Sequence, residues 1–346
     1  MAMKLGKVDV YNQCYNLRKQ QANMMDNASY YKLVHLVVIL CTVAPDYTIE
    51  CTEQMEAKVE EMTSSAKLFD QMIYIEDTVW HDDAARNTYA RVTEPIIHNR
   101  NRYKNILPDA YARIILKPLL PTDLTSSYIN AIKVNGFCAS SKFIVTQYPL
   151  PHTLEDFWRL VEQHHISTII CLNELDLSDK TCCKFYPSSD RPMAPMPHTI
   201  LECTDVIEGN YYNISTLNLI YPSEMAKCKE IKLLHVNNWT YSMLHPRTPA
   251  QLLAVYDQMD ILTRSSTPIL VTCLDGAHAS GLYTSMSCVV DKIKMEHVCD
   301  VCLAVRIVKR SRGEFVRRPE QFAFLYKCAY EYVCQLSNYS NFFIKK

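Results

Sequence analysis

Residues 268–281 read PILVTCLDGAHASG. The apolar, β-branched run Pro268–Cys273 predicts a buried strand, and a helix is expected over Ser280–Met295. Two of only six glycines in the chain, Gly276 and Gly281, fall in the connection. A cysteine that ends a strand here would lie among backbone N–H groups and at the positive end of a helix dipole, which can hold an oxyanion and favour a thiolate. A plain buried cysteine before a glycine turn is the structural alternative.

Outside this unit, short β-branched runs alternate with amphipathic segments, which is typical of an α/β fold. Strands are expected over residues 143–146, 167–172, 231–236 and 268–273. Helices are expected over residues 154–163, 249–263, 280–295, about 299–311 and 319–335. Apolar residues at three- or four-residue steps near Met55 and Val59 predict a helical N-terminal region, residues 1–70, before a larger domain, residues 71–340.

The composition excludes several classes of protein. A net charge of −1 gives no global electrostatic reason to bind nucleic acid or an anionic membrane. The 15 cysteines form neither a disulfide framework nor a paired CxxC pattern, so we expect no zinc site, no other metal and no cofactor. The start of the chain lacks a signal-peptide pattern, and the apolar run 33–44 is shorter than a membrane span. We expect a cytoplasmic protein, with peripheral contact at the plasma membrane as the alternative for residues 30–45.

Five further segments, in one order over more than 200 residues, resemble the classical protein tyrosine phosphatase domain. They are NRYKNILP (101–108) followed by Arg113, SYINA (127–131), FIVTQYPL (143–150) with DFWR (156–159), CDV (299–301) continuing to Arg312, and QFAFLY (321–326) with EY (331–332). The resemblance implies an α/β fold: a strongly twisted mixed sheet, flanked by helices, with one cleft at the Cys273 loop.

The resemblance also implies catalytic roles that this sequence only partly keeps. The family signature is His-Cys-x5-Arg-Ser/Thr-Gly, in which Cys273 matches the nucleophile and Ser280 the hydroxyl that helps the thiolate leave. Ala279 stands at the arginine position, so the planar bidentate ligand for phosphate is missing. Asp275 stands where the family has a small neutral residue, and its carboxylate would repel a phosphate dianion and a thiolate. Alternatively, Asp275 turns outward into solvent.

Two further family positions differ. The family's general acid is the aspartate of a Trp-Pro-Asp loop; a register on Trp239 places Tyr241 there, and a register on Pro246 places Ser242 there. Neither residue is a carboxylic acid, and loss of a general acid typically costs a factor of ~10²–10⁴ in rate. Arg317 replaces the glutamine that orients water, whereas Gln321 matches a second glutamine. Arg317 has three interpretations: an ion pair with Asp275 that plugs the pocket, a relocated phosphate clamp, or a solvated arginine.

These differences together predict a catalytically inactive pseudophosphatase, with Cys273 as a vestigial nucleophile. Substrate-recognition positions are better preserved: the resemblance assigns Tyr103 to stacking on phosphotyrosine and Asn105 to holding the substrate backbone. The expected ligand-binding residues are Tyr103, Asn105, Ser280, Arg317 and Gln321. The structural alternative is that the Asn-Arg-Tyr motif only supports the fold, with Arg102 tying loops together.

The leading hypothesis is therefore a cytoplasmic regulatory binding protein or scaffold in signalling, whose partner is a kinase or a tyrosine-phosphorylated protein and not nucleic acid. A slow or atypical tyrosine phosphatase that uses Cys273 is the competing hypothesis. A third is a scaffold whose partner site lies in residues 1–95. General likeness favours a nematode branch of the family, with members in egg activation or in hormone and insulin-like signalling.

Overall fold

The structure, a computed structural model of the chain, describes residues 9–24, 27–28, 30–32, 34–35, 38, 47–80, 99–108, 112–120, 122–222, 227–263 and 267–339. The chain divides into a small unit, residues 1–47 and 69–82, and a large unit, residues 48–68 and 83–346. The expected boundary near residue 70 therefore differs from the observed one, because residues 48–68 belong to the large unit.

The small unit contains helices, as the sequence predicts for the N-terminal region. Helix α2 spans Val10–Gln20 and is capped by Asp9, whose carboxylate accepts the backbone N–H of Asn12. Most of α5 (Lys67–Trp80) also belongs to this unit. Most of the apolar run 33–44, for which membrane contact is the alternative interpretation, lies outside the described residues. Within the described ranges, no helix is both long and apolar enough to cross a bilayer.

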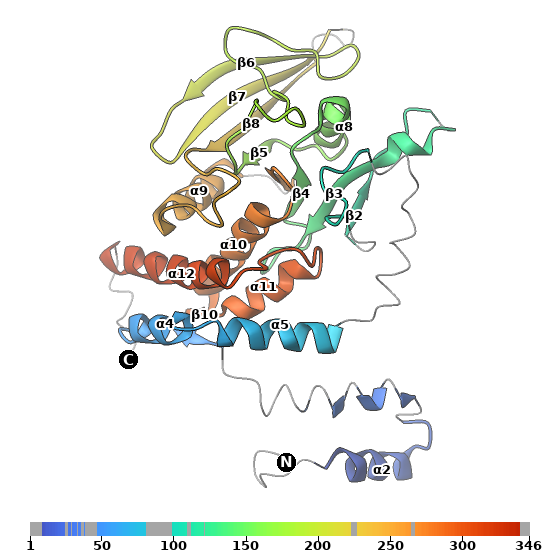
Figure 1. Cartoon of the computed structure of the whole chain (residues 1–346), viewed down its shortest axis with the longest axis vertical. Coiled ribbons are helices and arrows are strands. Elements are labelled where there is room, and N and C mark those ends of the chain that lie inside the picture. The colour runs from blue at the N-terminus through green and yellow to red at the C-terminus, as the bar shows by residue number, and fades with distance from the viewer. Residues whose placement is uncertain are drawn as a thin grey trace. The chain divides into compact units, whose positions relative to one another are not determined.

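The large unit is built on an eight-stranded mixed sheet with the order β2-β3-β4-β9-β5-β8-β7-β6 (Figure 1). Its strands are β2 (Arg113–Ile115), β3 (Tyr128–Val134), β4 (Phe143–Gln147), β5 (Thr168–Cys171), β6 (Ile200–Ile207), β7 (Tyr212–Tyr221), β8 (Lys227–Val236) and β9 (Ile269–Cys273). The central strands β4, β9, β5 and β8 are parallel, and the strands on both flanks are antiparallel. The mixed α/β sheet expected from the resemblance is confirmed.

Helices cover both faces of the sheet. Successive side chains of a strand point to opposite faces, so they identify which helix packs on which face. Leu270 of β9 and Ile169 of β5 share one apolar cluster with Phe157 and Leu160 of α8 (Leu154–Gln163). Their neighbours along each strand point to the opposite face, where α10 contacts β9. The remaining helices are α9 (Pro249–Leu262), α10 (His278–Glu296), α11 (Val301–Lys309), α12 (Pro319–Tyr339) and the short η1 (Leu124–Ser127) and η2 (Pro151–Thr153).

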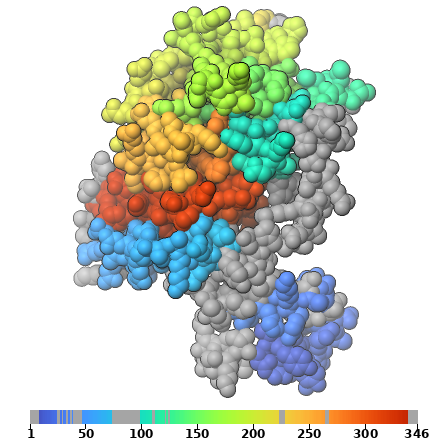
Figure 2. Space-filling model, in the orientation of Figure 1, coloured from blue at the N-terminus to red at the C-terminus, as the bar shows by residue number. Residues whose placement is uncertain are grey.

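Residues 48–68 contact the large unit through a short strand pair and one helix. Strand β1 (Ile49–Glu50) pairs with β10 (Val298–Cys299), and α4 (Met55–Thr63) lies against α12. On the face shown in Figure 2, α12 lies between α4 and α9. These contacts place the periodic Met55 and Val59 side chains in the core of the large unit.

The sheet topology gathers polar loops at one edge. Strand β9 is buried at all five positions, and its last residue, Cys273, lies beside Gln147 at the end of β4. Because parallel strands end at the same edge, the segments that follow β4, β5, β8 and β9 converge there. The N–H of Tyr148 donates to the Cys273 carbonyl over 2.8 Å, which fixes this edge around the cysteine.

Candidate functional site

The cysteine and the carboxylate of the loop after β9 are closed to solvent. Cys273 is 0% exposed and Asp275 is 1% exposed. Gly276 has φ +68°, and a Cβ there would lie 2.6 Å from the Gln147 backbone nitrogen, so this position requires glycine. A Cβ at Gly281 would lie 2.7 Å from the Phe315 side chain. The two glycines therefore let the loop and α10 approach neighbouring segments closely.

Asp275 turns inward and occupies the anion-binding part of this loop. One carboxylate oxygen accepts the backbone N–H of Ala277 over 2.8 Å and that of His278 over 3.1 Å. The other oxygen bonds the His278 ring nitrogen Nδ1. The alternative in which Asp275 turns outward into solvent is therefore wrong. Donors at the start of α10 that could hold an external oxyanion already hold a carboxylate of the same chain.

The Cys273 sulfur lies between a hydroxyl and this carboxylate. Ser280 Oγ donates to Cys273 Sγ over 3.0 Å, and Sγ donates to Asp275 Oδ1 over 3.3 Å. Burial, followed by the Asp275 charge, raises the pKa of Cys273 to about 12. The sulfur is therefore a protonated thiol near neutral pH, and a thiol is a much weaker nucleophile than a thiolate.

Asp275 and His278 form an ion pair at the start of α10. Burial favours a neutral Asp275, but the His278 hydrogen bond and charge and the two loop amides leave the pKa of Asp275 below its ordinary value. The hydrogen bond to Asp275 raises the pKa of His278, against burial and the nearby charges of Arg317 and Arg318. His278 is not among the site residues predicted from the sequence. Its spacing of three residues from Asp275, across a helix start, is the signal that could have identified it.

Among the residues that the structure describes, no guanidinium takes the place of the arginine that the family has at the position of Ala279. Ala279 is buried. The nearby Arg312 is also buried, and it donates to the Gly276 carbonyl over 2.6 Å and to Asn130 Oδ1 over 2.6 Å. The Arg312 side chain therefore supports the cysteine loop by binding the backbone carbonyl of Gly276.

The segment that follows β8, residues 239–244, covers the cysteine loop and is called the lid below. Trp239 is buried and its ring N–H donates to the Met243 carbonyl over 3.1 Å. The Tyr241 ring lies 6.2 Å from the Tyr103 ring, at an interplanar angle of 17°, and 6.4 Å from the His278 ring. Tyr241 therefore lies beside Tyr103, while Ser242 pairs with Thr240.

Tyr241 is poorly suited to donate a proton. Burial, then a hydrogen bond with Tyr103 and the charge of Asp275, raises the pKa of Tyr241 above its ordinary value. A group with such a pKa is a weak acid at neutral pH. The lid therefore brings an aromatic ring to the mouth of the loop and no carboxylic acid.

Gln321 joins the lid to the cysteine loop. Its side chain is buried, and Nε2 donates to the Leu244 carbonyl over 3.1 Å and to the His278 carbonyl over 3.4 Å. The lid and the start of α10 are thus fixed to one another by a single amide from α12.

Arg317 does not pair with Asp275. Its side chain is 53% exposed, contacts Glu314 over 3.3 Å and donates to the Gly313 carbonyl over 3.3 Å. The ion pair that would plug the pocket is therefore not formed, because Asp275 bonds the nearer His278 instead. Of the three interpretations, the solvated arginine agrees with this arrangement.

The Asn-Arg-Tyr segment has a clear structural role. Arg102 donates to the carbonyls of Tyr148 (3.3 Å) and Thr181 (3.0 Å), and its backbone N–H donates to Gln147 Oε1 over 3.0 Å. This arginine therefore ties loops together, as the structural alternative supposes. Asn105 is exposed next to this segment.

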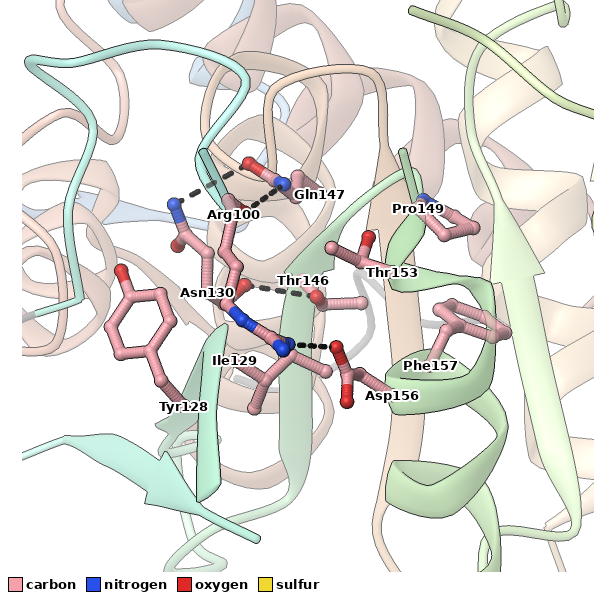
Figure 3. A pocket seen from close by; sticks show the side chains of 10 residues that line it. All are labelled: Arg100, Tyr128, Ile129, Asn130, Thr146, Gln147, Pro149, Thr153, Asp156 and Phe157. Carbon is pink, nitrogen blue, oxygen red and sulfur yellow. Dashed lines mark hydrogen bonds and ion pairs between the residues drawn. The ribbon is translucent and has the colours of Figure 1, made fainter. Parts of the chain in front are cut away.

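Behind this segment lies a small polar cavity of about 10 Å³, lined by Arg100, Asn130, Gln147 and Asp156 among others (Figure 3). Its polar groups are largely satisfied by one another: Gln147 donates to the Arg100 carbonyl over 3.0 Å, and Arg100 pairs with Asp156. A cavity of this size holds about one water molecule. It is too small for a substrate. In the part of the chain that the structure describes, no group of three His, Cys, Asp or Glu side chains is arranged to bind a metal.

Comparison with known proteins agrees with the fold. The family model described as protein-tyrosine phosphatase matches residues 97–331, which is more than half of the chain. Human receptor-type tyrosine-protein phosphatase alpha is 25% identical over 345 residues, covering 97% of this chain and 42% of that protein. The Lar-like tyrosine-protein phosphatase of Caenorhabditis elegans is 25% identical over 342 residues, covering 96% of this chain and 15% of that protein.

Mouse receptor-type tyrosine-protein phosphatase epsilon is also similar, with 24% identity over 353 residues that cover 97% of this chain and 49% of that protein. The chain thus spans less than half the length of these relatives. Since the family model covers both the central sheet and the Cys273 loop, the chain belongs to the protein-tyrosine phosphatase family.

Proposed function

We propose that this chain is a catalytically inactive member of the family, a pseudophosphatase, that acts as a regulatory binding protein or scaffold in intracellular signalling. The observation that carries the proposal is the inward carboxylate of Asp275, which takes the loop amides of Ala277 and His278. A phosphate dianion in the same place would have to displace this carboxylate and would meet its charge.

Three further features support the loss of phosphoryl transfer. The thiol of Cys273 is held protonated, with its pKa raised to about 12. Ala279 supplies none of the charge-assisted hydrogen bonds of an arginine, each worth about 1.5–3 kcal/mol. Tyr241 brings no carboxylic acid, which removes a factor of ~10²–10⁴. These effects do not add strictly, but each opposes the same transition state.

A binding role draws support from what remains at the site. Tyr103 and Tyr241 form an aromatic pair at the mouth of the loop, and Gln321 fixes the lid that carries Tyr241. The proposed partner is a signalling protein, either a kinase or a tyrosine-phosphorylated protein, met in the cytoplasm or at the inner face of the plasma membrane. Placement in a nematode branch, with roles in egg activation or hormone and insulin-like signalling, belongs to the same proposal.

A slow tyrosine phosphatase is the second candidate, and one specific contact favours it. Cys273 and Ser280 keep their mutual contact at 3.0 Å, so two of the reacting groups of the family are in place. The relatives are themselves named as tyrosine-protein phosphatases.

Hydrolysis of a phosphotyrosine peptide by the purified chain separates the two candidates. We expect no phosphate release above that of the Cys273→Ser variant, with the catalytic domain of a receptor-type phosphatase as the positive control. Phosphate release that disappears in Cys273→Ser would overturn the proposal and establish the slow enzyme. The triple variant Asp275→Ala, Ala279→Arg, Tyr241→Asp tests the argument in the other direction, because it restores the neutral residue, the arginine and the acid; we expect Cys273-dependent hydrolysis from it.

A further inference from the structure

The lid carries an exposed apolar patch, formed by side chains that are only partly buried in the fold. Tyr241 is 40% exposed and Leu244 is 39% exposed, although both lie within six residues of the fully buried Trp239. The ring of Tyr103 stacks beside Tyr241 and extends the patch. Clustered exposed aromatic and branched side chains are typical of protein-binding sites.

This patch is held in one arrangement before any partner binds. Trp239 anchors the start of the lid, because Asn173 and Glu174 both donate to its carbonyl, over 3.3 and 3.0 Å. Gln321 holds the end of the lid at Leu244. A surface that is already ordered loses little conformational entropy on binding, so a modest contact area can suffice for affinity.

The side chains around the patch are mainly cationic. Arg247 follows the lid, and Arg317 and Arg318 lie close enough to His278 to act on its charge; all three arginines are exposed. Lys104, next to Tyr103, is exposed as well. Against these four cations stand the exposed carboxylates of Glu320 and of Glu174, whose Oε1 accepts the backbone N–H of Asn238. Glu314 is half-buried and engaged with Arg317, and Asp275 is buried beneath the surface. A partner that approaches this face therefore meets an excess of positive charge.

We propose that this face, formed by Tyr103, Tyr241, Leu244, Arg247, Arg317 and Arg318, binds a carboxylate-rich, unphosphorylated segment of a partner protein. One aromatic or branched apolar side chain of the segment packs on Tyr241 and Leu244, and flanking Asp or Glu side chains pair with the arginines. No phosphate is needed, because the loop amides that would hold one are bonded to Asp275. The inference rests on the proposed binding function and names the chemistry of its partner.

Fluorescence anisotropy with four labelled peptides tests this proposal. The peptides are EEEFLEEE, a basic twin KKKFLKKK, an acidic peptide without the apolar pair, EEESSEEE, and the phosphotyrosine version EEE-pTyr-LEEE. We expect the first peptide to bind with an affinity that falls as salt is added, and the basic twin and the serine peptide to bind at least about tenfold more weakly. We expect the phosphotyrosine version to bind within about threefold of the first peptide.

Variants then locate the site. We expect the double variant Arg317→Ala, Arg318→Ala to weaken EEEFLEEE binding about tenfold, and Tyr241→Ala to weaken it by a similar factor. Arg191→Ala, which removes an exposed arginine between β5 and β6, is the matched control and should leave the affinity unchanged. Since all these side chains are exposed, the variants should keep the melting temperature of the parent chain.

Three results would overturn the inference: equal binding of the acidic and basic peptides, unchanged affinity in both the arginine and the Tyr241 variants, or phosphotyrosine binding more than about tenfold tighter than that of EEEFLEEE. None of these results depends on hydrolysis of the phosphotyrosine peptide, because the anisotropy titrations are repeated with the Cys273→Ser variant. Failure of the surface would therefore be distinguishable from failure of the inactive-phosphatase proposal, which only Cys273-dependent hydrolysis would show.

Discussion

Asp275→Asn should make Cys273 more reactive without rebuilding the loop. Asparagine has the size of aspartate, and its amide oxygen can still accept the N–H groups of Ala277 and His278. What disappears is the negative charge 3.3 Å from the sulfur. That charge is the second cause of the raised pKa of Cys273, after burial.

The expected size of the effect follows from the fraction of thiolate. With a pKa of about 12, Cys273 carries roughly 10³-fold less thiolate near neutral pH than a cysteine at the ordinary value of 9.0. Two unit charges 3.3 Å apart interact by about 5 kcal/mol at an effective dielectric constant near 20, and the His278 charge beside Asp275 reduces the part that acts on Cys273. Because burial remains, we expect the pKa to fall by about one to two units and the alkylation rate to rise about 10- to 100-fold.

Alkylation by iodoacetamide, followed by peptide mass spectrometry from about pH 6 to about pH 10, measures this rate at each cysteine. The exposed Cys228 serves as the internal reference, and Cys273→Ser provides the blank. In the parent chain, Cys273 should react at least about 10³-fold more slowly than Cys228 near neutral pH. Two results would contradict this prediction: Cys273 of the parent chain reacting as fast as Cys228, or Asp275→Asn leaving the rate at Cys273 unchanged while the protein stays folded.

Three further perturbations test the geometry of the loop and lid. Asp275 raises the pKa of His278, so their ion pair stabilises the fold fully below about pH 6.5 and less as the pH rises through the pKa of His278 in the folded protein. The melting temperature of the parent chain should therefore exceed that of His278→Gln by less at about pH 9 than at about pH 6. A difference that stays constant over this range would contradict the prediction. Gly276→Ala should cost about 1–3 kcal/mol in urea unfolding, since alanine at φ +68° would also strike a neighbouring backbone, and a loss below about 0.5 kcal/mol would show that the loop can adapt. Gln321→Leu should speed hydrogen exchange in the lid by removing its bonds to Leu244 and His278, at a cost of about 1–3 kcal/mol overall. Unchanged exchange would mean that other contacts hold the lid.

The fold was predictable mainly where burial leaves a strong local pattern. Strands β5 and β9 are buried at every position and read as continuous apolar runs, and α8 shows a clear apolar face. All these elements were predicted within one or two residues. The hairpin of β6 and β7 was not predicted, because β6 ends in four exposed positions and β7 mixes buried with half-exposed positions without a regular alternation. Such a pattern resembles that of a loop when no partner strand is known.

Some features of the site can be read from the sequence motif, and others depend on the three-dimensional arrangement. The missing arginine at Ala279 follows from alignment with the family signature. The partner of Asp275 does not, because charge alone favours Arg317 as much as His278. Helix geometry makes the choice: His278 lies three residues away across the first turn of α10, whereas Arg317 approaches from a separate segment and finds Glu314 first.

The inward carboxylate has a consequence for competition by free ions. Asp275 is attached two residues from Cys273 and is held by two amides and an imidazole, so it behaves as a tethered ligand. Even short flexible tethers give effective concentrations in the millimolar range, and a rigid turn gives higher values. Inorganic phosphate, sulfate or vanadate at comparable concentrations would compete against a ligand that never diffuses away. The loop is in this sense permanently occupied, and its shape does not depend on the anion content of its surroundings.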